Sequence, residues 1–220
     1  MRLSLSVYSR YVTNLAVFLR RPFDIIGTHR RAFVILTAAS LGAFLLGILV
    51  TVLVPELRPG GLGALQGESG ALGVGTLIAD SYRSGSILIA AVVTFAVNLV
   101  LASVLQTTLP TLIIPFLGVV LTLARALSWG VLFTPVGAED PRFLLHWVTL
   151  AIEGAAYLIV GFAAWVHGRY FLQPKRFGFA SRGEGYRAGL VATLQLYVLV
   201  VILLVVGAIY EAATVILFIA

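Results

Sequence analysis

Residues 32–54 read AFVILTAASLGAFLLGILVTVLV, and no side chain in this stretch is charged. A helix needs about 20 mostly apolar residues to cross the roughly 30 Å of hydrocarbon in a bilayer. The whole chain of 220 residues has the same character, since 60% of it is hydrophobic and 11% is charged. A soluble domain carries about 25% charged residues. Because the polar residues are too few to cover a soluble surface, the sequence predicts an integral membrane protein.

Further apolar runs of similar length follow along the chain and predict an all-α bundle of five transmembrane helices. The predicted spans are Ala32–Val54, Ser86–Leu105, Leu109–Phe133, Phe143–Val166 and Leu190–Ile219. The LQTTLP segment at 105–110 is so short that the second and third spans should form a tight antiparallel hairpin, with Pro110 in the first turn of the third. Ala39, Ala43 and Gly47 recur every four residues and indicate close helix packing by the first span.

The distribution of basic residues predicts the orientation. Residues 1–31 contain six arginines and one acid, and the 167–188 connection contains five basic residues and one acid. These two segments hold eleven of the fifteen basic residues and lie on the same side of a five-span protein. The positive-inside rule places that side in the cytoplasm. We therefore expect a multi-pass protein of the cell (cytoplasmic or inner) membrane, with its N-terminus inside and its C-terminus outside.

Two segments outside the spans have their own patterns. Within the cytoplasmic segment 1–31, residues 3–19 alternate apolar and polar side chains at helical spacing, which predicts an amphipathic helix in the membrane interface that ends at residues 20–22. Packing of this helix against the bundle is the alternative. The 55–85 connection is a glycine-rich extracytoplasmic loop. It lacks the Lys-Ser or Lys-Thr of a phosphate-binding loop, so flexibility or partner binding is the better interpretation.

Three charged residues lie deep inside the predicted spans. One is Glu153, in the otherwise uncharged stretch TLAIEGAAYLIVG (149–161), and the others are Arg125 and Glu211. From the helical rise, all three fall roughly 12–15 Å below the outer ends of their spans. Intramembrane charges are costly and usually pair inside a bundle. We therefore predict a polar cluster of Arg125, Glu153 and Glu211 with Asn98 as a neighbour.

The role of this cluster is open on the sequence alone. It could fix helix register, contact a partner, or handle protons or a transported species. One cation faces two carboxylates, so either one acid is protonated or a further donor is present. The candidate donors are Asn98, Gln195 and Tyr210.

Signatures of enzymes and metal sites are missing from the sequence. The chain has no cysteine, no serine–histidine–acid set and no HExxH motif. His146 and His167 lie roughly 31 Å apart along one helix, too far to share a metal. The net charge of +6 comes from residues that flank apolar spans, which argues against a nucleic-acid partner. We expect no catalytic residue, no cofactor and no metal.

Residues 86–220 resemble the stage II sporulation protein M family of multi-pass membrane proteins. The resemblance rests on stretches in four spans and one connection: TFAVNLVLASVL, PFLGVVLTLARALSWGVLF, TLAIEGAAYLIVG, QPKR…GYRAG and VVGAIYEAATV. It implies that Asn98, Glu153 and Glu211 are family-like positions. The chain departs from the family at Thr149, where a histidine is frequent, and at Arg125, where a second asparagine is frequent.

The resemblance implies a membrane scaffold, because the family's namesake anchors a complex with peptidoglycan-degrading partners during engulfment. The expected function is thus a non-enzymatic scaffold or complex subunit that recruits or assembles envelope-remodelling partners. Its expected partners are the lipid bilayer and other membrane or extracytoplasmic proteins, and a homo-oligomer is also compatible. The alternative is the permease subunit of a transporter driven by a separate ATPase, for which the arginine-rich cytoplasmic segments would suit docking of the motor.

Overall fold

The computed structural model describes residues 19–54, 74–134 and 144–219, and within these ranges the chain is helical and has no strand. Four helices are long and apolar enough to cross a membrane. They cover Arg30–Leu53, Ile87–Ile113, Leu145–Leu172 and Arg182–Phe218. The all-helical class is therefore confirmed, and these helices indicate a membrane protein.

The second and third apolar runs divide at a different place from the one predicted. The helix does not stop at 105–110: α5 (Ile87–Ala96) continues through η2 (Val97–Thr108) and α6 (Leu109–Ile113). The chain reverses at 114–116, before the shorter helix α7 (Leu117–Leu132). The predicted hairpin position is thus wrong.

The reason lies in the threonines of the LQTTLP segment. The Thr107 hydroxyl donates to the Ala102 carbonyl, and the Thr111 hydroxyl donates to the Thr107 carbonyl, both at 2.8 Å. Threonines that bond back to their own helix do not have to leave the apolar phase, so they do not break the helix. Pro110 is accommodated at the start of α6. The turn forms instead at Phe116, whose backbone has a φ of 67°.

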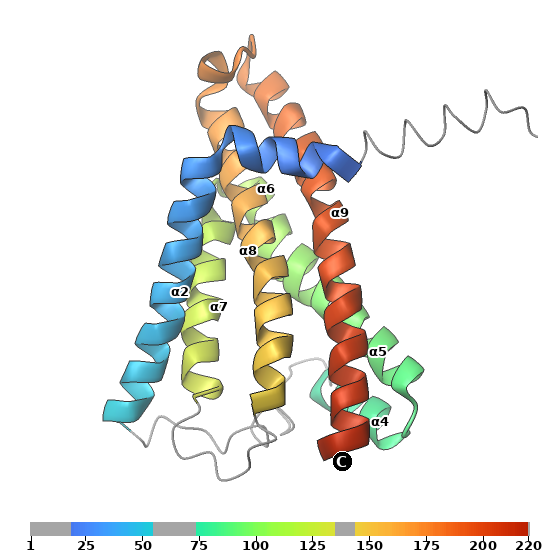
Figure 1. Ribbon diagram of the computed structural model, residues 1–220. Helices are drawn as coiled ribbons and strands as arrows, with labels where there is room; N and C mark the ends of the chain where they lie inside the picture. The colour runs from blue at the N-terminus through green and yellow to red at the C-terminus, as the bar shows by residue number, and fades with distance from the viewer. Residues whose placement is uncertain (1–18, 55–73, 135–143, 220) are drawn as a thin grey trace, which may run out of the picture.

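One end of the molecule is formed by the N-terminal helical residues 19–28 and the connection between α8 (Leu145–Leu172) and α9 (Arg182–Thr214) (Figure 1). His29, between residues 19–28 and α2 (Arg30–Leu53), lies 3.1 Å from the Tyr170 hydroxyl and packs against Phe177 in η4 (Pro174–Phe177). Burial, together with the charge of Arg169, lowers the pKa of His29, so its ring stays neutral in this aromatic cluster.

Residues 19–28 run across the end of α2 instead of continuing it (Figure 1). The predicted amphipathic helix at 3–19 lies almost wholly outside the described residues. Residues 19–28 are helical, so no helix ends at the predicted position 20–22.

The opposite end carries α4 (Val74–Arg83) and the end of α9, which continues as η5 (Val215–Ile219) (Figure 1). The glycine-rich loop predicted at 55–85 therefore contains a helix, while residues 55–73 lie outside the described part. Tyr82 explains why α4 folds back onto the bundle: its hydroxyl lies 3.0 Å from Thr94 Oγ1 in α5. Its ring also packs against the small cluster of Ala90, Ala91, Ala208 and Ala212.

Helix α8 is the centre of the bundle, and two of its glycines set its distance from α7 and from the turn before α7. Gly161 faces Thr122 and Gly168 faces Phe116, whereas a Cβ atom at Gly154 would make only ordinary contact with Trp129. A Cβ atom at Gly168 would lie 2.7 Å from the Phe116 ring, so the glycine makes room for the residue that forms the turn. Helices α8 and α9 share the most extensive contact in the molecule, and this packing surrounds Glu153.

Candidate functional site

The candidate site is organised around η2, whose 12 residues are wound as a π-helix. The Ser103 hydroxyl donates to the Asn98 carbonyl five residues earlier, at 2.8 Å, and the backbone N–H of Leu109 donates to the Val104 carbonyl. Most π-helical segments are single turns, and many of them occur at functional sites. A segment this long presents polar groups to several neighbouring helices.

The first of these contacts joins η2 to α8. The Asn98 side-chain amide donates to Glu153 Oε1 at 2.5 Å. Glu153 is only 6% exposed, and its Cγ lies 3.2 Å from where a Cβ of Gly207 in α9 would stand. The glycine therefore gives the carboxyl group space between α8 and α9, and Asn98 supplies the hydrogen bond that a buried carboxyl group requires.

Glu211 lies one turn beyond Gly207 on α9 and completes the acidic part of the cluster. Its carboxyl group is close enough to Glu153 for the two to interact electrostatically, and it also interacts with the Tyr82 hydroxyl from α4. Asn98, Glu153 and Glu211 therefore lie together.

Arg125 approaches the same π-helical segment from α7. Its Nη2 donates to the Ala102 carbonyl at 3.2 Å and to Gln106 Oε1 at 3.0 Å, and its guanidinium carbon lies 4.3 Å from the centroid of the Tyr157 ring. Within 19–54, 74–134 and 144–219, the ion pairs are Arg20–Asp24 and Arg83–Asp80, both exposed, so no ion pair joins Arg125 to a carboxylate. Backbone, amide and aromatic groups take the place of an acid.

A third contact ties η2 to α9. The hydroxyl groups of Thr108 and Tyr197 lie 2.5 Å apart. Segment η2 is thus bonded to α7 through Ala102 and Gln106, to α8 through Asn98 and to α9 through Thr108. We call this set of contacts the η2 network.

Sequence reasoning missed several members of this network. Tyr157 could have been found, because it lies one turn after Glu153 on α8 and helical neighbours at that spacing share a face. Tyr197 and Gln106 carry no such signal, since their partners are far away in sequence. Of the candidate donors, Asn98 meets Glu153, whereas the Tyr210 hydroxyl donates to the Leu145 carbonyl at 3.4 Å. Gln195 lies about 24 Å from Glu211 along α9.

The network offers hydrogen bonds and charge but no set of metal ligands. Among the described residues, no group of three or more His, Cys, Asp or Glu side chains is placed to hold a metal ion. The chain matches no protein-family model, no curated protein and no solved structure. The chemistry of the η2 network is therefore the basis for a functional conclusion.

Proposed function

We propose that this protein is a non-enzymatic scaffold or complex subunit of the cell membrane, of the kind that the stage II sporulation protein M resemblance implies, and that it recruits or assembles envelope-remodelling partners. One observation carries the proposal: the polar side chains of the η2 network hydrogen-bond to neighbouring helices. These bonds join η2 to α8, α7 and α9 at successive positions along its length.

This use of polar groups differs from what a transporter needs. Intramembrane polar residues in transporters and pumps face a substrate path or form a relay for protons. Here Asn98 is bonded to Glu153, Thr108 to Tyr197, and Arg125 to a backbone carbonyl. Such bonds fix the relative positions of α7, α8 and α9, which is what a rigid platform for partner proteins requires.

We further propose five passes with the N-terminus in the cytoplasm and the C-terminus outside. Besides the four long helices, α7 would also cross the membrane, since its 16 residues extend about 24 Å. It would be the third of the five passes along the chain. The described basic residues support this orientation, because residues 19–31 and the α8–α9 connection contain most of them and contact each other through His29 and Phe177. Under this arrangement α4 lies on the outer side, where it could contact extracytoplasmic partners.

The permease subunit of an ATPase-driven transporter is the second candidate. It is favoured by the N-terminal helical residues 19–28, which cross the end of α2 at the same end of the molecule as the α8–α9 connection (Figure 1). These residues carry the exposed Arg20 and Arg21, and η4 in that connection is also basic. A cytoplasmic motor would dock on this surface.

A matched pair of cysteine variants tests both the orientation and the function. The chain has no cysteine, and Arg83 and Lys175 are exposed basic residues at opposite ends. We expect a membrane-impermeant maleimide to label Arg83→Cys in intact cells, and to label Lys175→Cys only after the cells are opened. A cysteine-linked photocrosslinker at Arg83→Cys should then capture an extracytoplasmic protein.

Two outcomes would contradict this proposal. Labelling of Lys175→Cys in intact cells would reverse the orientation. Capture of a nucleotide hydrolase from Lys175→Cys, with no product from Arg83→Cys, would identify the permease subunit instead of the scaffold.

A further inference from the structure

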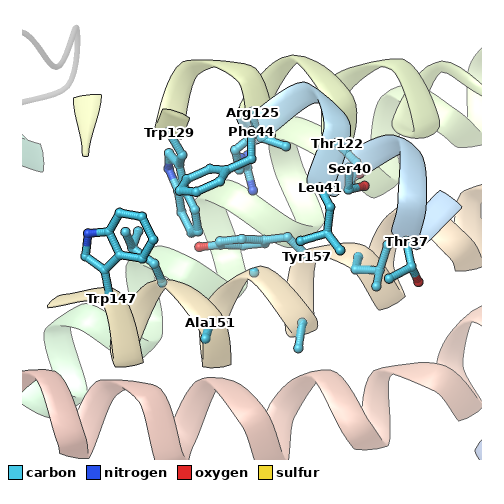
Figure 2. Close-up of a pocket in the computed structure, with 15 residues that line it drawn as sticks. Thr37, Ser40, Leu41, Phe44, Thr122, Arg125, Trp129, Trp147, Ala151 and Tyr157 are labelled. Atoms are coloured by element: carbon cyan, nitrogen blue, oxygen red, sulfur yellow. The ribbon is translucent and has the colours of Figure 1, made fainter. Parts of the chain in front are cut away.

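A cavity of about 410 Å³ lies between α2, α7 and α8, on the side of Tyr157 away from α9 (Figure 2). Each helix lines it with residues three and four apart, from Thr37 to Phe44, from Thr122 to Trp129 and from Trp147 to Leu158. One face of each helix therefore borders the same elongated space. In size it lies within the usual range of ligand pockets, about 300–1,000 Å³.

The cavity exists because α2 contacts α7 closely but α8 much less. The two backbones meet at Gly47 and Gly130, whereas α8 presents Ala151, Gly154 and Ala155 to the space. A Cβ atom at Gly154 would have one neighbour within 4 Å, the Trp129 ring at 3.9 Å. Small residues on α8 thus leave the volume open.

Aromatic rings form the walls, and two edge-to-face pairs hold them in place. Phe44 packs against Trp147 with ring centroids 5.7 Å apart, and Trp129 packs against Tyr157 at 5.4 Å. Figure 2 shows Trp147 at one end of the lining, Tyr157 in the middle and Thr37 at the other end. The walls suit a long apolar body.

The position and length of the cavity indicate which molecule fills it. Trp147 is the third residue of α8, so the cavity begins near one membrane surface, and the lining from Trp147 to Leu158 extends about 16 Å along the helix. That is about half of the roughly 30 Å hydrocarbon core, the depth of one leaflet. Leu41, which lines the cavity, is 59% exposed, so the space borders the outside of the bundle, where the solvent is lipid.

The Trp147 ring lies at the surface end of the lining, with Nε1 on the side away from the other labelled residues (Figure 2). Protein atoms cover this nitrogen, so the occupant of the cavity is held by apolar contact. Phospholipids, whose acyl chains surround the bundle, are the occupant that the position and length of the cavity indicate.

We propose that the cavity binds one acyl chain of a phospholipid from the leaflet at the end where α8 begins. The chain runs past Phe44, Trp129 and Tyr157 toward the middle of the membrane. Assignment of this leaflet as the outer one rests on the proposed orientation, but the site itself does not. The bound acyl chain fills the cavity between α2 and α8 and thereby stabilises the position of α2.

Native mass spectrometry of the purified full chain tests the site. The protein is delipidated, then mixed with vesicles of phosphatidylglycerol and phosphatidylethanolamine or with free oleic acid. We expect one phospholipid retained per chain in the wild type and none in Gly154→Leu, whose new side chain fills the cavity. Gly42→Leu is the matched control, because Gly42 has no atom within 4 Å of a Cβ and does not line the cavity, so it should retain the lipid.

Equal retention in the wild type and Gly154→Leu, or none in the wild type, would overturn the proposal. So would retention of oleic acid in preference to phospholipid, since this would identify a free fatty acid as the occupant. If Gly154→Leu fails to fold, the wild type loaded with brominated phospholipid and moved into detergent gives the answer. Tryptophan quenching that persists supports the site, and full recovery of fluorescence contradicts it.

Discussion

Replacing Gly130 with valine should destabilise the protein by about 3 kcal/mol. A Cβ atom at this position would overlap the Phe44 carbonyl oxygen and lie 2.9 Å from the carbonyl carbon, and Gly47 opposite it is equally tight against the Leu127 carbonyl. The obstructing atoms belong to the backbone of the facing helix, so no side-chain rotation relieves the overlap. Helices α2 and α7 would have to separate, and the Thr51 hydroxyl would lose its 3.4 Å contact with the Val131 carbonyl.

The free energy of unfolding, measured by titration with SDS in mixed micelles, checks this prediction. Gly42→Val is the control, because it makes the same chemical change on α2 at a position with open space around it. It should change stability by no more than about 0.5 kcal/mol. Similar values for Gly130→Val and Gly42→Val would show that the close approach of α2 and α7 does not contribute to stability.

Features that depend on a single helix were predictable from the sequence. The apolar runs located the long helices because lipid demands a continuous hydrophobic surface of known length. The small residues of the first span indicated close packing, and Gly47 is where the α2 and α7 backbones meet. Ala39, at the other end of the same stripe, is exposed, because α2 faces the exterior there.

Features that depend on how helices satisfy their polar groups were not predictable in the same way. The LQTTLP segment is polar enough to suggest a break, but Thr107 and Thr111 return their hydroxyl groups to their own helix. The π-helical winding of η2 has no composition signal either. The groups that Asn98, Ala102 and Thr108 contact lie on three other helices, which no local pattern in the sequence indicates.

In the candidate site, too, features of a single helix were predictable and contacts between helices were not. The depth argument placed Arg125, Glu153 and Glu211 at one level, with Asn98 as a neighbour, because the rise of a helix is constant. Depth does not determine which way a side chain points around the helix, however. Arg125 lies on the side of η2 that faces α7, with the Tyr157 ring against its guanidinium group. The hydrogen bonds of Asn98 and Arg125 support the proposed structural role of the cluster.

The hydrogen bond between Asn98 and Glu153 should be among the most important interactions for stability. Asn98→Leu removes the donor and leaves the Glu153 carboxyl group buried against Gly207, so we expect a loss of about 3 kcal/mol in the free energy of unfolding. Asn98→Leu combined with Glu153→Leu should cost less than the sum of the two single changes, by at least about 1 kcal/mol. The second substitution removes the group that the first left without a partner.

Arg125 supplies the control for this cycle. Arg125 bonds to Ala102 and Gln106 and interacts with Glu153 only electrostatically, without an ion pair, so Arg125→Met and Glu153→Leu should be coupled more weakly than Asn98→Leu and Glu153→Leu. The same SDS titration measures both cycles. A coupling energy that is larger for Arg125 with Glu153 than for Asn98 with Glu153 would mean that the cation, and not the amide, stabilises the buried carboxyl group. In that case the helices of this bundle would be joined by charge pairing and not by the hydrogen bonds of the η2 network.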